Sequence, residues 1–264
     1  MLTAISKDGT PIAFSRTGSG PALIVVDGAL CYRASGPSGP LAAALADRFT
    51  VYTYDRRGRG ESGNTTPYAV EREVEDLEAV IRAAGGKAFV YGVSSGAALA
   101  LEAADRGLPI AKLALYEAPF IVDSSRAPIP PDFLDRVNAA IDRGRRGEAV
   151  TLFMKLVGVP GIFTILMRLT PAWSKLTAVA HTLPYDITLV KNHEEGKPLP
   201  RGQWACATSP TLVMDGGKSP AWMRNAMRSL AEVLPHATYR TLPGQTHMIN
   251  AKAHLPALVE FFAY

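Results

Sequence analysis

A short apolar run between two turn signals is the feature that most constrains the fold of this chain. Residues 22–26, Ala-Leu-Ile-Val-Val, carry no polar side chain and lie between a Gly-Pro pair and an Asp-Gly pair. Such a run is typical of a strand that is buried on both faces, as in a parallel sheet covered by helices. Residues 49–54 and 88–91 predict the next two strands.

Helical patterns separate these strands. Between the second and third, apolar residues recur at helical spacing and charged residues fill the opposite face; the apolar positions are Val70, Val74, Leu77, Ile81 and Ala84. Further strands are predicted within residues 2–17 (two, joined at Asp8-Gly9), 111–116, 211–214 and 238–242. Alternation of strands and helices predicts an α/β fold, with a mostly parallel, doubly wound sheet of about eight strands.

The strand pattern stops between residues 120 and 205. This segment contains helical patterns and many prolines, but no buried strand pattern. We therefore predict a sheet domain formed by residues 1–119 and 206–264, and a helical cap formed by residues 120–205. The large apolar side chains of the cap, Phe163 and Trp173 among them, are expected to pack it onto the sheet or to line an apolar pocket.

Composition excludes several classes of protein. Lys and Arg number 28 against 24 Asp and Glu, a net charge of +4, and the basic residues form no stripe that aromatic residues interrupt, so nucleic acid is not expected as a partner. Cys31 and Cys206 are the two cysteines, which excludes a disulfide framework or a cysteine metal cluster. With neither a signal-peptide pattern nor a bilayer-spanning apolar stretch, we expect a cytoplasmic protein without a membrane partner.

The strongest chemical signal is the pentapeptide Gly92-Val93-Ser94-Ser95-Gly96. It directly follows a predicted strand and begins a helix of small residues. A serine on such a strand-to-helix turn has an exposed hydroxyl beside a helix N-terminus, whereas a purely structural turn would serve packing alone. This context predicts that Ser94 is a nucleophile and that Ser95 contributes its backbone N–H.

A second motif, Asp55-Arg56-Arg57-Gly58-Arg59-Gly60-Glu61-Ser62, follows the preceding strand. Together with residues 92–96, it resembles the α/β-hydrolase fold family, whose members carry a D-x-R-G-x-G-x-S loop at this place. The resemblance covers almost the whole chain. The polar side chains of the loop are expected to hold a tight turn, with a direct arginine contact to substrate as the alternative.

A nucleophilic serine needs a base, and the chain offers five histidines. His247 lies between the last predicted strand and the last predicted helix, where members of the family carry their catalytic histidine. His181 and His193 fall in the cap, where packing or surface roles are expected. We therefore assign the base to His247.

The resemblance also implies an oxyanion hole made of two backbone N–H groups. One belongs to Ser95, and the other is expected from Ala29 in the loop after the third strand. Many relatives have His-Gly in that loop, whereas this chain has Asp27-Gly28. Local hydrogen bonds within the loop are the expected role of Asp27.

The acid that orients the histidine is the least constrained member of the site. Many relatives place an Asp three residues beyond a glycine after the seventh strand, but that position is Ser219 here. Glu117 closes the sixth strand at the edge where such folds gather catalytic groups, and some relatives carry their acid there. We predict Glu117, with Asp215 or the absence of an acid as alternatives.

These assignments predict a serine hydrolase that cleaves an ester-like bond of a small or medium, apolar substrate through an acyl-enzyme. No metal and no organic cofactor are expected, and a small molecule is the expected partner. Thioesterase, lactonase and carbon–carbon hydrolase activities use the same residues and stay open. A pseudoenzyme that binds a small molecule without turnover is the alternative from another class, and the sequence leaves the oligomeric state open.

Overall fold

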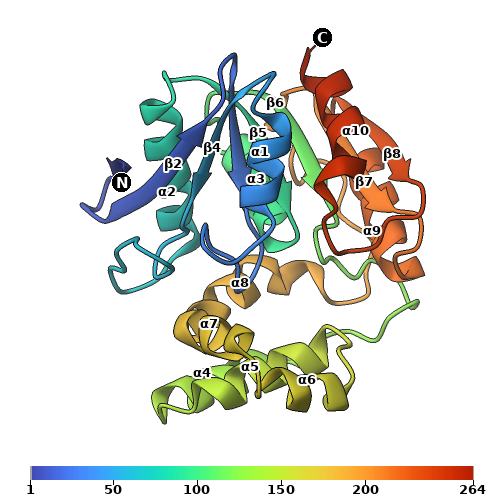
Figure 1. Ribbon diagram of the computed structural model, residues 1–264. Helices are drawn as coiled ribbons and strands as arrows, with labels where there is room; N and C mark the ends of the chain where they lie inside the picture. Colours follow the sequence, from blue (N-terminus) through green and yellow to red (C-terminus); the bar gives the residue numbers. More distant parts are fainter. Residues whose placement is uncertain (1, 264) are drawn as a thin grey trace.

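The computed structural model describes residues 2–263 and confirms the predicted eight-stranded α/β architecture (Figure 1). The strand order is β1-β2-β4-β3-β5-β6-β7-β8. The β1–β2 and β2–β4 pairs are antiparallel and all other pairs are parallel. The strands are β1 (Leu2–Ile5), β2 (Pro11–Thr17), β3 (Ala22–Val26), β4 (Thr50–Tyr54), β5 (Ala88–Val93), β6 (Ile110–Tyr116), β7 (Thr211–Gly216) and β8 (Ala237–Leu242).

Helices cover both faces of the sheet. Helices α1 and α10 pack on one face, and α2, α3 and α9 pack on the other. Their bounds are α1 (Ser38–Leu45), α2 (Val70–Ala83), α3 (Ser95–Asp105), α9 (Ala221–Val233) and α10 (Ala251–Ala263). Within residues 2–263, no helix combines the length and the apolar character that crossing a bilayer requires.

Strand β3 shows why the apolar run folds this way. Successive side chains of a strand point to opposite faces of the sheet. Leu23 and Val25 lie in the core beneath α1 and α10, and Ile24 and Val26 lie in the core beneath α2, α3 and α9. All four are buried, so the strand needs apolar residues at consecutive positions rather than at alternate ones.

The segment between β6 and β7 is helical, and Figure 1 shows it beneath the lower edge of the sheet, with α8 nearest to that edge. Its elements are α4 (Phe133–Asp142), α5 (Arg146–Leu156), α6 (Gly161–Met167), α7 (Pro171–Val179), η1 (Ala180–Thr182), α8 (Leu183–Val190) and η2 (Lys191–His193). We call residues 133–193 the helical insertion. Its helices enclose a separate apolar cluster, which Leu30 of the loop after β3 joins.

Two aromatic side chains near the ends of the segment between β6 and β7 are buried, unlike most of those on α6. Phe120 and Trp204 stack with ring centroids 5.8 Å apart inside the core of the sheet, and His193 packs against both rings. By contrast, four α6 side chains are each more than half exposed, so they are not among those that pack the insertion onto the sheet; these are Ile162, Phe163, Ile165 and Leu166.

Candidate active site

Parallel strands place their carboxyl ends at one edge of the sheet, and the predicted site residues follow these ends. Ser94 follows β5, Glu117 follows β6, and Ala29 lies in the loop after β3. His247 lies between β8 and α10. The topology therefore brings together residues that are up to 218 positions apart in the sequence.

Backbone strain is concentrated at this edge. Among residues 2–263, the non-glycine residues with positive φ are Leu30, Ser94 and Glu117, at 61°, 56° and 48°. Residues other than glycine rarely adopt a positive φ, because their Cβ atom would then approach the backbone closely. Strained residues persist where the surrounding structure holds them, and they cluster at functional sites.

Ser94 occupies the sharp turn that the sequence predicts. Its N–H donates to the carbonyl oxygen of Tyr116 at 2.9 Å, and α3 begins at the next residue. The turn lies directly against β3, since a Cβ on Gly96 would collide with the carbonyl oxygen of Val26. Ser94 is partly exposed while its neighbours on both sides are buried, so the turn presents this residue to solvent.

Glu117 and His247 are in direct contact. The Nδ1 atom of His247 lies 2.8 Å from Oε2 of Glu117, and the N–H of Gly216 donates to Oε1 of the same carboxylate at 2.7 Å. Glu117 is fully buried, whereas the His247 side chain is 36% exposed. With Nδ1–H donating to Glu117, the free lone pair of the ring is on Nε2, where a base needs it.

Asp215, the alternative acid, is not paired with His247. Its carboxylate accepts a hydrogen bond from the hydroxyl of Tyr239. Burial raises the pKa of Asp215, and the hydroxyls of Tyr239 and Thr241 oppose that rise. The structure thus brings Glu117, rather than Asp215, to the histidine ring.

Backbone contacts fix the loop that carries His247. The hydroxyl of Tyr116 donates to the carbonyl oxygen of Thr246 at 2.7 Å. The N–H of Lys218 donates to the carbonyl oxygen of Gln245 at 2.8 Å. Tyr116 is the residue before Glu117, so one strand end holds both the acid and the loop of the histidine.

The loop after β3 touches Ser94. A Cβ added to Gly28 would lie 2.9 Å from Cβ of Ser94 and 3.5 Å from its Oγ. Only glycine permits this approach without displacement of the serine. Ala29 is partly exposed between the buried Gly28 and Leu30. Because it directly follows Gly28, its backbone lies beside the serine turn.

Asp27 does not hold this loop by local hydrogen bonds, so that expectation is wrong. The carboxylate is buried, and within residues 2–263 neither of its oxygens accepts a hydrogen bond of ordinary geometry. Burial raises the pKa of Asp27 to about 6, against the opposing effects of the Ser38 hydroxyl and of the positive charges of Arg59 and Arg56.

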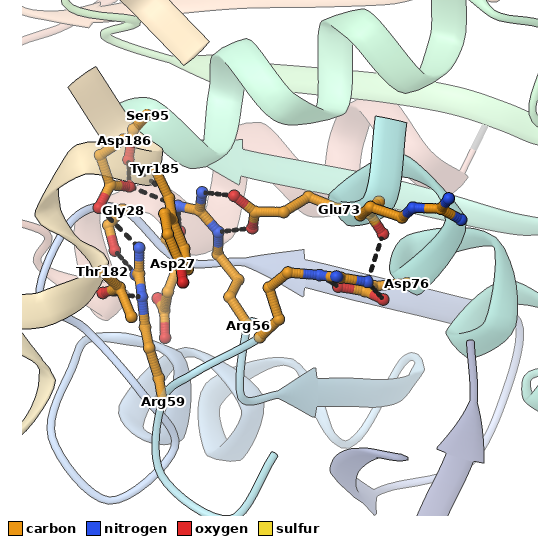
Figure 2. Close-up of polar contacts among 12 residues, drawn as sticks. Asp27, Gly28, Arg56, Arg59, Glu73, Asp76, Ser95, Thr182, Tyr185 and Asp186 are labelled. Carbon is orange, nitrogen blue, oxygen red and sulfur yellow. Dashed lines mark hydrogen bonds and ion pairs between the residues drawn. The ribbon is translucent and has the colours of Figure 1, made fainter. Parts of the chain in front are cut away.

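Buried arginines lie behind the loop (Figure 2). Arg56 donates through Nε and Nη2 to both oxygens of Glu73, at 2.6 and 2.7 Å, and through Nη1 to Oδ1 of Asp186 at 2.7 Å. Arg59 donates through Nη2 to Oδ2 of Asp186, also at 2.7 Å. Two positive and two negative charges are therefore balanced within one buried cluster, and Asp186 brings α8 into it.

The same guanidinium groups hold the backbone of the loop after β3. Nη1 of Arg59 donates to the carbonyl oxygen of Gly28 at 2.6 Å and to that of Cys31 at 3.2 Å. Nη1 of Arg56 lies 3.3 Å from the carbonyl oxygen of Asp27. Both arginines are thus engaged inside the protein, in agreement with the expectation of a structural role.

Contacts within the arginine-glycine loop agree only in part with the sequence analysis. The hydroxyl of Ser62 donates to the carbonyl oxygen of Asp55 at 2.6 Å, and the Asp55 carboxylate accepts the N–H of Glu61 at 2.9 Å, as a tight turn requires. Arg57 instead reaches α2, where it donates to both oxygens of Asp76.

Asp186 is the residue of this region that sequence reasoning missed. It lies in a helix that carried no recognisable motif, and 127 positions separate it from Arg59. A usable signal was the pair of arginines beside the loop glycines, since buried guanidinium groups require carboxylate partners. Within the described residues, no three His, Cys, Asp or Glu side chains are grouped as metal ligands.

Comparison with known proteins agrees with this fold. A model of the alpha/beta hydrolase family matches residues 18–259. The chain is 53% identical to an alpha/beta hydrolase from Sphaerobacter thermophilus, with a TM-score of 0.91 over 99% of this chain and 100% of that one.

Two more distant structures share the fold. One is a thermophilic esterase from Thermogutta terrifontis, at 21% identity and a TM-score of 0.70 over 99% of this chain and 97% of that one. The other is an enol-lactonase from Burkholderia xenovorans, at 20% identity and a TM-score of 0.73 over 100% of both chains. With the family model matching most of its length, the chain belongs to the alpha/beta hydrolase family.

Proposed function

We propose that this protein is a serine hydrolase that cleaves ester bonds through an acyl-enzyme. The observation that carries the proposal is the 2.8 Å contact between Glu117 and His247 at the strand edge that also presents Ser94. An acid, a base and a nucleophile in the chain order Ser94, Glu117, His247 match the requirements for activating a hydroxyl.

In the acylation step, Oγ of Ser94 attacks the ester carbonyl carbon and its proton passes to Nε2 of His247. Glu117 stabilises the positive charge that the ring acquires. The carbonyl electron pair moves to the oxygen, and this oxyanion is stabilised by the N–H groups of Ala29 and Ser95. The intermediate then collapses, and the leaving alcohol takes the proton from His247.

Deacylation repeats these steps with water. His247 takes a proton from a water molecule as its oxygen attacks the acyl carbon. The second tetrahedral intermediate expels Ser94, which recovers its proton from the ring, and the carboxylic acid leaves. Apart from the attacking water, the groups that carry these protons, Ser94 and His247, belong to the chain itself.

The helical insertion is proposed to cap this site and to select a small or medium apolar substrate. Its apolar cluster includes Leu30, the residue after Ala29, so the loop of the proposed oxyanion hole borders an apolar region. The names of the esterase and of the enol-lactonase with this fold support acyl chemistry. Thioesters, lactones and cleavable carbon–carbon bonds remain alternative substrates on the same residues.

A fluorophosphonate probe tests the proposal against a binding protein without turnover. An activated serine is labelled covalently, whereas a serine without a base is not. Labelling should be accompanied by hydrolysis within a panel of p-nitrophenyl esters, thioesters and lactones of graded chain length. A folded protein that neither reacts with the probe nor hydrolyses any member of the panel would favour the binding protein.

Replacement of the nucleophile should separate the two adjacent serines. Ser94→Ala should lower kcat by several orders of magnitude and leave ground-state binding nearly unchanged, because only the reacting hydroxyl is lost. Ser95→Ala should be much milder than Ser94→Ala, because its proposed contribution to the reaction is a backbone N–H and its hydroxyl does not react. Steady-state kinetics on the best ester of the panel checks both; a Ser94→Ala variant with the wild-type rate would refute the serine mechanism.

The two candidate acids make a matched pair. Glu117→Gln should lower kcat by roughly 10³- to 10⁴-fold, since the amide no longer stabilises the protonated ring. Asp215→Asn should change kcat little, because Asp215 contacts Tyr239 instead. Circular dichroism establishes that both variants are folded. A large loss of rate in Asp215→Asn with a near-normal Glu117→Gln variant would transfer the acid role to Asp215.

Asp27 should affect stability rather than the reaction. Its pKa of about 6 in the folded protein exceeds the ordinary value of 3.8, so the free energy of unfolding falls as pH rises from about 4 to about 6 and stays at the lower value above that range. Asp27→Asn should therefore raise the free energy of unfolding at pH 8 by up to about 3 kcal/mol. The gain should disappear below about pH 4, where wild-type Asp27 is protonated in both states.

Denaturant unfolding across this pH range measures the effect, with the exposed Asp47→Asn as control. Catalytic rates of the Asp27→Asn variant should stay close to the wild-type values, because Ala29 contributes only its backbone N–H. Equal pH profiles of stability for wild type and Asp27→Asn would contradict this account.

A further inference from the structure

The hydrogen bond from Arg59 to Gly28 has a consequence for the next residue. The carbonyl of Gly28 and the N–H of Ala29 belong to one planar peptide unit, in which they point in opposite directions when the bond is trans. Arg59 holds the carbonyl oxygen at 2.6 Å, on the side of the buried charges. The guanidinium therefore fixes the direction of the Ala29 N–H, and its charge polarises that donor.

Such a hold is needed because the loop itself is permissive. Gly28 has no Cβ to restrict rotation, and Leu30 already has a strained positive φ of 61°. Gly28 also lies against Ser94, where a rotated peptide would turn a carbonyl oxygen toward a developing negative charge. Within the loop, the N–H of Cys31 reaches the same carbonyl oxygen at 3.4 Å. The contact of 2.6 Å from Arg59, which comes from outside the loop, is therefore the stronger constraint on this peptide unit.

Asp186 connects these contacts to the second donor. Its Oδ2 accepts from Arg59, and its Oδ1 accepts both from Arg56 and from the hydroxyl of Ser95, each at 2.7 Å (Figure 2). The carboxylate is buried, and all three partners are charged or hydroxyl donors. Burial alone would raise the pKa of Asp186, but Arg59 and Arg56 hold it below its ordinary value.

We propose that Asp186 of α8 is a positioning residue for the oxyanion hole. Through Arg59 it orients the N–H of Ala29, and through the side chain of Ser95 it holds the other donor. This inference rests on the proposed function and extends it: the helical insertion supports the chemical step itself, in addition to covering the substrate.

A purely structural salt bridge is the competing explanation, and the chain contains a matched control for it. Arg57 and Asp76 form a second buried pair in the same arginine-glycine loop, with two hydrogen bonds of 2.7 Å. Among residues 2–263, neither side chain forms a hydrogen bond with the loop after β3 or with Ser95. Asp76→Asn therefore breaks a comparable buried pair without disturbing either proposed donor.

The test compares three proteins: wild type, Asp186→Asn and Asp76→Asn. Each is assayed with butyl trifluoromethyl ketone as inhibitor and p-nitrophenyl pentanoate as substrate, two compounds with the same acyl chain. Ser94 adds to the ketone carbon, its proton passes to His247, and the carbonyl electron pair becomes an oxyanion in the hole. Asp186→Asn should weaken inhibition by the ketone about 10- to 100-fold and lower kcat by a similar factor. KM for the ester should change less than about threefold, because ground-state binding makes no use of the oxyanion donors.

Asp76→Asn should reduce thermal stability while ketone inhibition and kcat stay within about threefold of wild type. If Asp186→Asn does not fold, the double variant Arg59→Met with Asp186→Asn removes the unpaired buried charge and should show the same losses, since Arg56 keeps Glu73 as its partner. A folded Asp186 variant with wild-type inhibition and kcat would overturn the inference alone. Wild-type protein that neither binds the ketone nor hydrolyses the ester would overturn the proposed function, and this inference with it.

Discussion

Parallel pairing of the central strands is the constraint on which the rest of the structure depends. Since β3, β5, β6, β7 and β8 run in one direction, their carboxyl ends meet at a single edge. Every residue of the candidate site follows one of these ends. The burial that allows parallel pairing, with apolar side chains on both faces of the strands, thereby also determines where the chemistry is placed.

Strain and buried charge at this edge would destabilise the fold if nothing compensated for them. The positive φ values of Ser94 and Glu117 are held by hydrogen bonds to neighbouring strand ends, from Ser94 N–H to Tyr116 and from Glu117 N–H to Met214. The arginines behind the loop after β3 are paired with carboxylates and donate hydrogen bonds to backbone carbonyl oxygens. In both cases the hydrogen bonds and ion pairs that offset the strain or the buried charge also fix the geometry of the site.

Local patterns in the sequence sufficed to predict much of the fold and part of the candidate site. Apolar runs located the strands to within a few residues, and the Gly92–Gly96 pentapeptide located the serine turn. The contact of Glu117 with His247 was anticipated from the position of a strand end, together with the family resemblance. By contrast, the partner of Arg59 was not predictable, because Asp186 lies in a helix distant in sequence and no periodicity marks it.

The central claim is that an acyl group is transferred to Ser94, and intact-mass spectrometry of acid-quenched turnover tests it most directly. Protein mixed with p-nitrophenyl pentanoate should carry one pentanoyl group during turnover, and peptide mapping should place that group on Ser94. Ser94→Ala protein should carry none. Release of p-nitrophenol at the full wild-type rate without any acyl group on Ser94, or with the group on Ser95, would contradict the account.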